Sequence, residues 1–267
     1  MNQGAQNMAE LLNIEYVWKA PQKRNVEEQI QIFNQAVNSG ADAILLAASD
    51  PLAIAGAVQD AKAKGVKVIY VDSPAYEDAV VMLGTQNYQA GMLAGEKMLE
   101  ILEDRGIRNG SIGIIGVSLV NLTTMDRERG FREVIERDGR YHLLTTKYTE
   151  SDVPASYEAA KAFIQSNEDL VGLFGTSEES TFGMGMAIRE SGREIVGIGF
   201  DITEDILDMI REGDINVTLA QNPYTMGYLG MAEAIAALKA YNTGPGFIDT
   251  GVTVVDKYTP TRLIPIV

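Results

Sequence analysis

The chain has 267 residues, of which 46% are hydrophobic and 22% charged, and its formal net charge is −15. This length can form one large domain or two lobes with proper cores, and the composition is that of an ordinary globular protein. The acidic balance argues against nucleic acid or an anionic membrane as a partner, because such affinity comes mainly from Lys and Arg that neutralise phosphates. The absence of Cys excludes disulfides and thiolate sites, and the single His142 excludes a metal site or catalytic triad built on a His cluster. We therefore expect no metal and no cofactor.

No stretch of the sequence approaches the ~20 apolar residues that cross a bilayer. The residues after Met1 are polar and do not resemble an export signal. We expect a soluble chain from which any export signal or anchor has been removed.

Short apolar runs rich in β-branched residues alternate with amphipathic segments along almost the whole chain. This alternation is typical of βα units on parallel sheets. Continuous apolar runs such as residues 43–47 fit strands that helices cover on both faces. In chain order, we predict strands over residues 14–18, 43–47, 66–71, 80–83, 111–115, 141–146, 170–174, 195–200, 217–220 and 252–255.

The segments between these strands have helical periodicity. Val26, Ile30, Phe33 and Val37 lie four, three and four residues apart, which places one apolar stripe toward a core. Gly192 follows such a segment and precedes a strand, where a residue that adopts positive φ best ends a helix. These signals favour an α/β fold.

The chain shows no linker rich in Gly, Ser or Pro. Lobes joined by several short hinge segments need no such linker. We expect the first crossing between lobes within residues 105–110 and the second at Asn222-Pro223.

Three motifs could be part of a catalytic or cofactor site, but each also has a purely structural interpretation. The run Gly110-Ser-Ile-Gly-Ile-Ile-Gly resembles a dinucleotide loop, but its glycines lie within a strand pattern, so phosphates would not meet a helix N-terminus. We interpret His142, in an apolar strand-like run, as a structural residue. The pairs Glu178-Glu179 and Glu204-Asp205 begin helices, where carboxylates offset the helix dipole, and we interpret most such acids as caps rather than as acid/base pairs.

Polar side chains follow many of the predicted strands at the point where each strand ends. In open α/β sheets, ligands bind beyond the carboxyl ends of the strands. A rim of hydroxyls and amides with few charges suits a neutral polyhydroxyl ligand, because each hydroxyl can both donate and accept. The rim comprises Ser49-Asp50, Asp72-Ser73, Thr85-Gln86-Asn87, Thr176-Ser177-Glu178, Asp201 and Gln221-Asn222.

Several segments resemble the type I periplasmic binding proteins, the ribose-binding-like group whose fold is shared with the effector domains of LacI-type repressors. The matching segments are Ala41-Asp-Ala-Ile-Leu-Leu-Ala-Ala-Ser-Asp-Pro, Gly65-Val-Lys-Val-Ile-Tyr-Val-Asp-Ser, Arg127-Glu-Arg-Gly-Phe, Val196-Gly-Ile-Gly-Phe-Asp and Thr218-Leu-Ala-Gln-Asn-Pro. The resemblance implies an α/β fold of two doubly wound parallel-sheet lobes joined by three hinge crossovers. By position, lobe one takes residues 1–107, 224–248 and 259–267, and lobe two takes residues 110–221 and 249–256.

The resemblance also implies a ligand site in the cleft between the lobes. Asp201 and Gln221 match the family's polar ligand contacts directly. Arg127 matches the arginine of the family's Arg-x-x-Gly-Phe motif, but Met125 is an alternative residue for the sugar-contacting position. The implied ligand-binding residues are Asp72, Gln86, Arg127, Ser177, Glu178, Asp201, Gln221 and Asn222.

Several positions depart from the ribose-binding pattern. Ala47 or Ala48 stands where a ribose binder offers Asn, Gln86 replaces an Asp, and Ser177-Glu178 replaces Asn-Asp. A pentose-specific assignment therefore does not follow. Glu178 is an alternative contact for a cationic or amino group, since an uncompensated buried carboxylate is costly.

The beginning of the chain departs most from the family. Family members open with a β-strand and an aromatic-bearing loop, whereas this sequence begins at the helix that follows them. Residues 262–267 read like that first strand, so we expect a circularly permuted or rearranged chain in which they lie beside residues 14–18 and 43–47. Pro265 counts against this expectation, because Pro is tolerated only at an edge or a strand end.

The resemblance implies an extracytoplasmic, monomeric solute-binding protein that closes its lobes around a small polar ligand such as a sugar. Its partner would be the permease of an ABC transporter or a sensor kinase. One alternative is the effector-binding core of a LacI-type regulator, which needs a helix-turn-helix before the first strand. Another is an enzyme that uses carboxylates in the interlobe cleft, against which the absence of Cys and of a phosphate loop counts.

Overall fold

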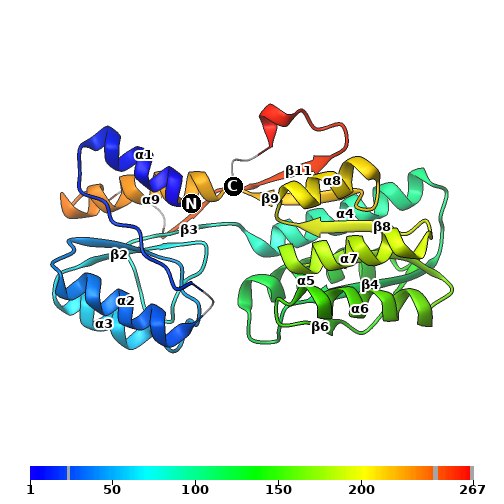
Figure 1. Cartoon of the computed structure of the whole chain (residues 1–267), viewed down its shortest axis with the longest axis horizontal. Coiled ribbons are helices and arrows are strands. Elements are labelled where there is room, and N and C mark those ends of the chain that lie inside the picture. Colours follow the sequence, from blue (N-terminus) through cyan, green and yellow to red (C-terminus); the bar gives the residue numbers. More distant parts are fainter. Residues whose placement is uncertain (23–24, 243–245, 265–267) are drawn as a thin grey trace. The chain divides into compact units, whose positions relative to one another are not determined.

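The computed structural model describes residues 1–22, 25–242 and 246–264, and these form two compact units (Figure 1). Unit 1 comprises Met1–Thr85 and Asn222–Gly251, and unit 2 comprises Gln86–Gln221 and the described residues from Val252 onward. The chain thus passes between the units after Thr85, Gln221 and Gly251.

Unit 1 is a parallel sheet with helices on both faces. Its strands lie in the order β1-β2-β3-β10. Helices α1 and α9 cover one face and α2 and α3 cover the other (Figure 1). The strands are β1 (Ala43–Leu46), β2 (Lys67–Val71), β3 (Met82–Gly84) and β10 (Phe247–Asp249), and the helices are α1 (Asn2–Leu12), α2 (Val26–Asn38), α3 (Ala55–Ala63) and α9 (Pro223–Leu238).

Successive side chains of β2 point to opposite faces of the sheet. Val68 and Tyr70 pack in the core under α2 and α3, while Ile69 and Val71 pack in the core under α9. Because both faces are covered, the strand is a continuous apolar run rather than an alternating one.

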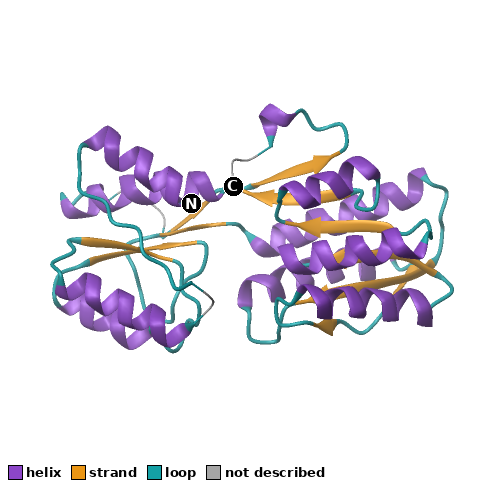
Figure 2. Cartoon of the chain, viewed as in Figure 1, coloured by secondary structure: helices purple, strands orange, loops and turns teal. Residues whose placement is uncertain are grey.

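Unit 2 has the same layered architecture around a larger sheet (Figure 2). Its strands lie in the order β11-β9-β8-β7-β4-β5, with β6 also paired to β4 and with β11 antiparallel to β9. The strands are β4 (Gly110–Gly116), β5 (Tyr141–Leu143), β6 (Lys147–Tyr148), β7 (Leu170–Gly175), β8 (Val196–Phe200), β9 (Val217–Gln221) and β11 (Val252–Asp256). The helices are α4 (Asn87–Asp104), α5 (Leu122–Asp138), α6 (Val153–Ser166), α7 (Glu178–Ser191) and α8 (Glu204–Glu212), followed later by the short 3₁₀ helix η1 (Thr261–Leu263).

The faces of the unit 2 sheet bury separate cores. Phe174 of β7 packs with α4 and α5, whereas its neighbour Leu173 packs with α6, α7 and α8. Adjacent residues of a strand point to opposite faces, so the sheet is covered on both sides. This doubly wound α/β architecture confirms the fold class predicted from the sequence.

Local signals at helix ends behave as predicted. Gly192 ends α7 with φ of +63°. The acidic pairs Glu178-Glu179 and Glu204-Asp205 occupy the first turns of α7 and α8, where carboxylates stabilise the helix dipole. The glycine run at Gly110 is the buried strand β4, as its strand pattern indicated.

The first crossing lies earlier than the predicted residues 105–110. The chain leaves unit 1 after Thr85, and α4 belongs to unit 2. The reason is packing: Ala94 and Met98 of α4 are fully buried in the same core as Phe131 of α5. The apolar side of α4 faces that core. The position of α4 in the sequence does not show which of the two units it packs against.

The predicted strand at residues 14–18 is not a strand in the structure. Among the described residues, β1 pairs only with β2, so no neighbour completes a ladder on the outer side of β1. Ile14 and Tyr16 pack against Ala5 and Ala9 of α1, while the side chains of Val17 and Trp18 remain exposed. The segment has strand composition, but no strand among the described residues pairs with it.

The expected strand over residues 262–267 is also wrong where the structure describes it. Arg262 and Leu263 lie in η1, and Ile264 packs against the core of unit 2 rather than beside β1. The preceding Pro260 cannot donate to a ladder, and burial of Ile264 favours the observed position. Residues 265–267 lie outside the described residues.

Candidate functional site

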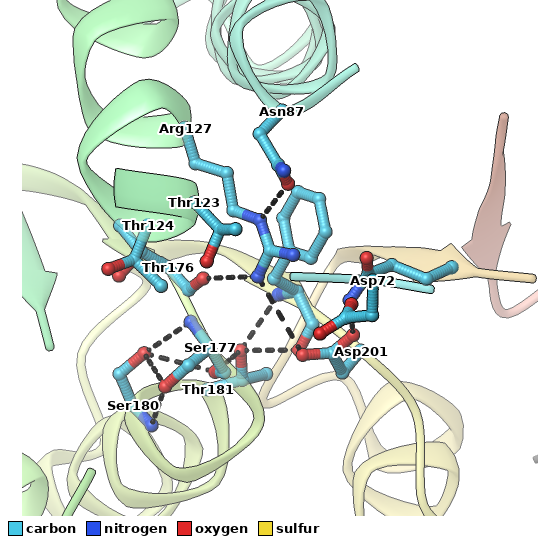
Figure 3. A network of polar contacts seen from close by, with 12 residues as sticks. Asp72, Asn87, Thr123, Thr124, Arg127, Thr176, Ser177, Ser180, Thr181 and Asp201 are labelled. Atoms are coloured by element: carbon cyan, nitrogen blue, oxygen red, sulfur yellow. Dashed lines mark hydrogen bonds and ion pairs between the residues drawn. The ribbon is translucent and has the colours of Figure 1, made fainter. Parts of the chain in front are cut away.

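Asp201, at the end of β8 in unit 2, lies within a network of polar contacts (Figure 3). A second polar side chain reaches it from the end of β9. Gln221 Nε2 donates a 2.7 Å hydrogen bond to Asp201 Oδ1, and Thr218 Oγ1 donates a 2.7 Å hydrogen bond to the Asp201 carbonyl oxygen. Because parallel strands end at one edge of a sheet, residues 20 positions apart in the sequence meet here.

The backbone of Asp201 is strained. Its φ is +65°, in the left-handed region that non-glycine residues seldom adopt, and that conformation costs about 1 kcal/mol or more. The Asp201 amide donates to the Leu219 carbonyl at 3.0 Å, which holds the turn in place. Asp72 follows β2 in unit 1 with a similar φ of +69°. Strain of this kind concentrates at functional sites.

Arg127 of α5 joins the Asp201 pair to two further chain segments. Its Nε donates to Asn87 Oδ1 at 2.8 Å and its Nη1 donates to the Thr176 carbonyl at 2.9 Å. Its Nη1 also lies 3.8 Å from Asp201 Oδ2. The side chain is only 5% exposed, and its guanidinium carbon lies 3.6 Å from the centre of the Phe200 ring. The predicted ligand contact Arg127 is therefore buried among its protein partners.

Two glycines allow Arg127 to reach Asn87. A Cβ at Gly91 of α4 would lie 2.0 Å from the Arg127 carbonyl oxygen, and one at Gly130 of α5 would lie 2.1 Å from the Tyr88 carbonyl oxygen. Helices α4 and α5 thus approach so closely that no larger residue fits at either position. This contact places the first turn of α4 beside the Arg127 side chain.

Ser177 caps α7, and Thr181 in the next turn reaches β8. The Ser177 side chain and Ser180 form a reciprocal capping box at the start of the helix. Thr181 Oγ1 donates to the Ser177 carbonyl at 2.7 Å and accepts from the Phe200 amide at 2.8 Å. The hydroxyl of Ser177, a predicted ligand contact, is engaged in capping.

Glu178 begins α7 close to Asp201. Desolvation of its carboxyl group raises the pKa of Glu178, and the negative charges of Glu179 and Asp201 raise it further. The site therefore carries more carboxylates than Arg127 alone balances. A ligand with hydroxyl or ammonium donors suits this arrangement better than an anion does.

The other predicted contacts lie at the unit boundaries or in unit 1. Gln86 is exposed at the start of α4. Asn222 Nδ2 donates to the Thr250 carbonyl at 2.7 Å, within unit 1. Asp72, also in unit 1, accepts a 2.7 Å hydrogen bond from Ser73 Oγ. The alternative contact Met125 is half-buried in α5, with its sulfur 3.9 Å from the Tyr148 hydroxyl.

The structure thus brings Arg127, Asp201 and Gln221 together, with Ser177 and Glu178 on the neighbouring strand end. Sequence reasoning missed the structural partners that connect them. Asn87 and Thr176 were noted as polar residues at strand ends, but not as partners of Arg127. Thr181 and Phe200 were missed, and no local sequence signal marks them as part of the site.

Other kinds of site find no support in the part of the chain that the structure describes. His142 is an exposed residue of β5. Within residues 1–22, 25–242 and 246–264, no three His, Asp or Glu side chains gather in a way that could hold a metal ion. No described helix has the length and apolar character needed to cross a membrane.

Comparison with known proteins places this architecture in a recognised group. A family model described as a periplasmic binding protein domain matches residues 1–242. The ribose import binding protein of Bacillus subtilis (strain 168) is 28% identical over 209 residues, which are 78% of this chain and 66% of that protein. The aligned region therefore spans just under two thirds of that relative.

Solved structures are similar over almost the whole chain. The sugar-binding protein of a sugar ABC transporter from Bacillus halodurans is 28% identical with a TM-score of 0.90, and the match covers 96% of this chain and 91% of that chain. An arabinose binding protein from Geobacillus stearothermophilus is 28% identical with a TM-score of 0.87, covering 96% and 90% respectively.

Proposed function

Because the chain belongs to the periplasmic binding protein family, with the type I fold, we propose that it captures a sugar and delivers it to the permease of an ABC importer. Proteins of this family act outside the cytoplasm, and an extracytoplasmic location follows from membership. The names of the relatives support the sugar class, since they include a ribose and an arabinose binding protein.

The observation that carries the proposal is the Asp201–Gln221 pair beside Arg127. A carboxylate offers about four lone-pair sites, and Gln221 donates to one oxygen only. Hydroxyl hydrogen bonds to an ionised carboxylate are short and strong, so Asp201 can anchor two hydroxyls of one sugar. The amide of Gln221 supplies both a donor and an acceptor and matches the dual character of a hydroxyl.

Capture by lobe closure completes the proposal. An open form binds the sugar on one lobe, and contacts from the other lobe stabilise the closed form. The proposed contacts from unit 1 are Asp72 and Asn222. Those proposed from unit 2, besides Asp201 and Gln221, are Gln86, Arg127, Ser177 and Glu178. The protein acts as a monomer, performs no chemistry on the sugar, and is recognised in its closed form by the permease or by a sensor kinase.

A thermal-shift screen tests this proposal. The panel contains D-ribose, L-arabinose, D-xylose, D-fucose, D-glucosamine, a polyol and several amino acids. Ligand at 100 times its Kd adds about 2.7 kcal/mol to the folded state, which raises Tm by about 5 °C or more for a chain of this size. Binding of amino acids but of no sugar would contradict the sugar class, and conversion of any bound compound into product would contradict a pure binding role.

A further inference from the structure

We propose that Asn109 is a site of hydrolytic deamidation, at which the folded protein slowly converts an asparagine into isoaspartate and aspartate. Asn109 and Gly110 form the only Asn-Gly pair in the sequence. They lie in unit 2, where the loop after α4 meets the first residue of β4. The inference concerns the covalent chemistry of the chain and does not depend on sugar binding.

The reaction needs only water and these two neighbouring residues. The backbone nitrogen of Gly110, after losing its proton, attacks the side-chain carbon Cγ of Asn109. The new N–C bond closes a five-membered succinimide ring, while the C–N bond of the side-chain amide breaks and its nitrogen leaves as ammonia with a proton taken from water. Water then opens the ring. Opening at Cγ gives aspartate with the normal main chain, whereas opening at the α-carbonyl carbon gives isoaspartate, whose main chain runs through Cβ.

The loop leaves Asn109 accessible to this reaction. Residues 107–109 belong to no helix or strand, and Asn109 is exposed to water. Within an α-helix, by contrast, the amide of the following residue donates to a carbonyl four residues earlier, which holds the attacking nitrogen in place. An exposed loop position imposes no such helical hydrogen bond.

The fold requires glycine at the attacking position. Gly110 has a φ of +141°, a conformation that residues with a Cβ seldom adopt. A Cβ here would lie 2.6 Å from Val171 Cγ1 and 2.7 Å from the Asp169 carbonyl oxygen. A side chain would also shield the attacking nitrogen, so glycine leaves that nitrogen open. The start of β4 thus demands the residue type that makes Asn109 most reactive.

Asn38 provides a matched control within the chain. It is also exposed and is also followed by a small residue, Ser39. Asn38 is the last residue of α2, and the Ser39 amide donates to the Gln35 carbonyl at 2.9 Å. The Asn38 side-chain oxygen accepts a 3.3 Å hydrogen bond from Lys64 Nζ. Because its attacking nitrogen is engaged and lies beside a Cβ, Asn38 should stay intact.

Isoaspartate disturbs the start of β4, because it adds one carbon atom to the main chain between two fixed points. The Ile107 carbonyl accepts a 2.7 Å hydrogen bond from the Tyr141 hydroxyl, and the Ser111 amide donates to the Asp169 carbonyl at 2.9 Å. The longer main chain shifts the pairing of Gly110 with Tyr141. Aspartate keeps the normal main chain and adds only a negative charge.

Incubation of the folded full chain tests the proposal. Samples kept at 37 °C at pH 6 and at pH 8 are digested with trypsin, and mass spectrometry follows the peptides that contain Asn109 and Asn38. We expect the Asn109 peptide to gain the mass of an NH₂-to-OH exchange, and the Asn38 peptide to stay unchanged. The gain should be faster at pH 8, because the attacking nitrogen must lose its proton. Isoaspartyl methyltransferase with labelled S-adenosylmethionine measures the isoaspartate formed.

Two variants separate the chemistry from its structural effect. Asn109→Gln should abolish the mass gain, since the longer side chain closes a ring much less readily. Asn109→Asp should keep the wild-type Tm, whereas aged wild type should lose Tm in proportion to its isoaspartate content.

An Asn109 peptide that stays intact in the folded protein at pH 8, or that reacts only in urea, would overturn the proposal. Equal reaction at Asn38 would overturn it as well, because the local geometry would then not select the site. Failure of the chain to bind any sugar changes neither outcome.

Discussion

Gln221 Nε2 and Asp201 Oδ1, 2.7 Å apart, connect the ends of two adjacent parallel strands in unit 2. Asp201 adopts a left-handed backbone conformation to face its partner, and Arg127 supplies the opposite charge from α5. The pair is thus supported from the sheet and from a helix. Support on both sides keeps the carboxylate preorganised, which lowers the entropic cost of binding a flexible polyol.

Asp201→Asn should weaken sugar affinity about tenfold to a hundredfold with little loss of stability. Asn tolerates the left-handed conformation and keeps the shape of the side chain, while it removes the charge that strengthens hydroxyl hydrogen bonds. Calorimetric titration measures the change. The control is Asp208→Asn in α8, where an exposed carboxylate pairs with Arg211 and affinity should stay unchanged. Equal affinity in wild type and Asp201→Asn would show that the ligand is held elsewhere.

Glu178→Gln should raise the free energy of unfolding at pH 7 by a small amount, below about 1 kcal/mol because charges near the surface are screened. The folded state raises the pKa of Glu178 through desolvation and the charges of Glu179 and Asp201, so its ionised form destabilises the folded protein. The relevant pH window lies between the unfolded pKa of Glu178, near 4.5, and its higher pKa in the folded state. Within that window the folded state holds more protons than the unfolded state. The free energy of unfolding therefore decreases as pH rises through the window. The gain from Glu178→Gln should therefore disappear below that window.

Glu204→Gln is the matched control for this measurement. Glu204 is also the first residue of a helix, α8, where a carboxylate stabilises the dipole. Its replacement should lower the free energy of unfolding slightly at pH 7, so the two variants should change stability in opposite directions. Urea unfolding at pH 7 and pH 4 measures both, and a loss of stability in Glu178→Gln at pH 7 would contradict the assignment.

Gly91→Ala should destabilise unit 2 by about 1–3 kcal/mol, because its Cβ would lie 2.0 Å from the Arg127 carbonyl oxygen. Displacement of α5 should also weaken sugar binding, since Arg127 moves with it. Gly56→Ala in α3 is the matched control: nothing lies within 4 Å of its Cβ, and alanine should stabilise the helix by up to about 1 kcal/mol. Unfolding monitored by circular dichroism would show opposite signs, and a stabilised Gly91→Ala would refute the close contact.

Trp18 lies in residues 14–18, the segment for which the described residues offer no partner strand. It is the sole tryptophan of the chain, and 53% of its side chain is exposed. We expect fluorescence emission near that of free tryptophan, with ready quenching by acrylamide and only a small shift on unfolding. Emission at short wavelength with strong protection from quenching would show instead that residues 14–18 are covered.

Much of the fold was predictable because its signals are local. The apolar runs at residues 43–47 and 66–71 became β1 and β2, and Gly192 and the acidic first turns marked helix ends as expected. Such features depend on residues within one or two turns of each other, so the order of residues suffices to recognise them. Asp201 and Gln221 were also placed in advance at strand ends, and the structure has them at the ends of β8 and β9.

Tertiary structure decided what depends on distant partners. Residues 14–18 have the composition of a strand, but a strand exists only where another chain segment offers a ladder, and none described lies beyond β1. The motif around Arg127 does not indicate its protein partners, but close packing of α4 on α5 places its side chain against Asn87, Thr176 and Phe200. The sequence by itself determined the α/β class, the strand ends and the polar residues at them. Packing decided which of those polar residues support the site and which face outward. The reason is that burial depends on contacts between residues from the whole unit.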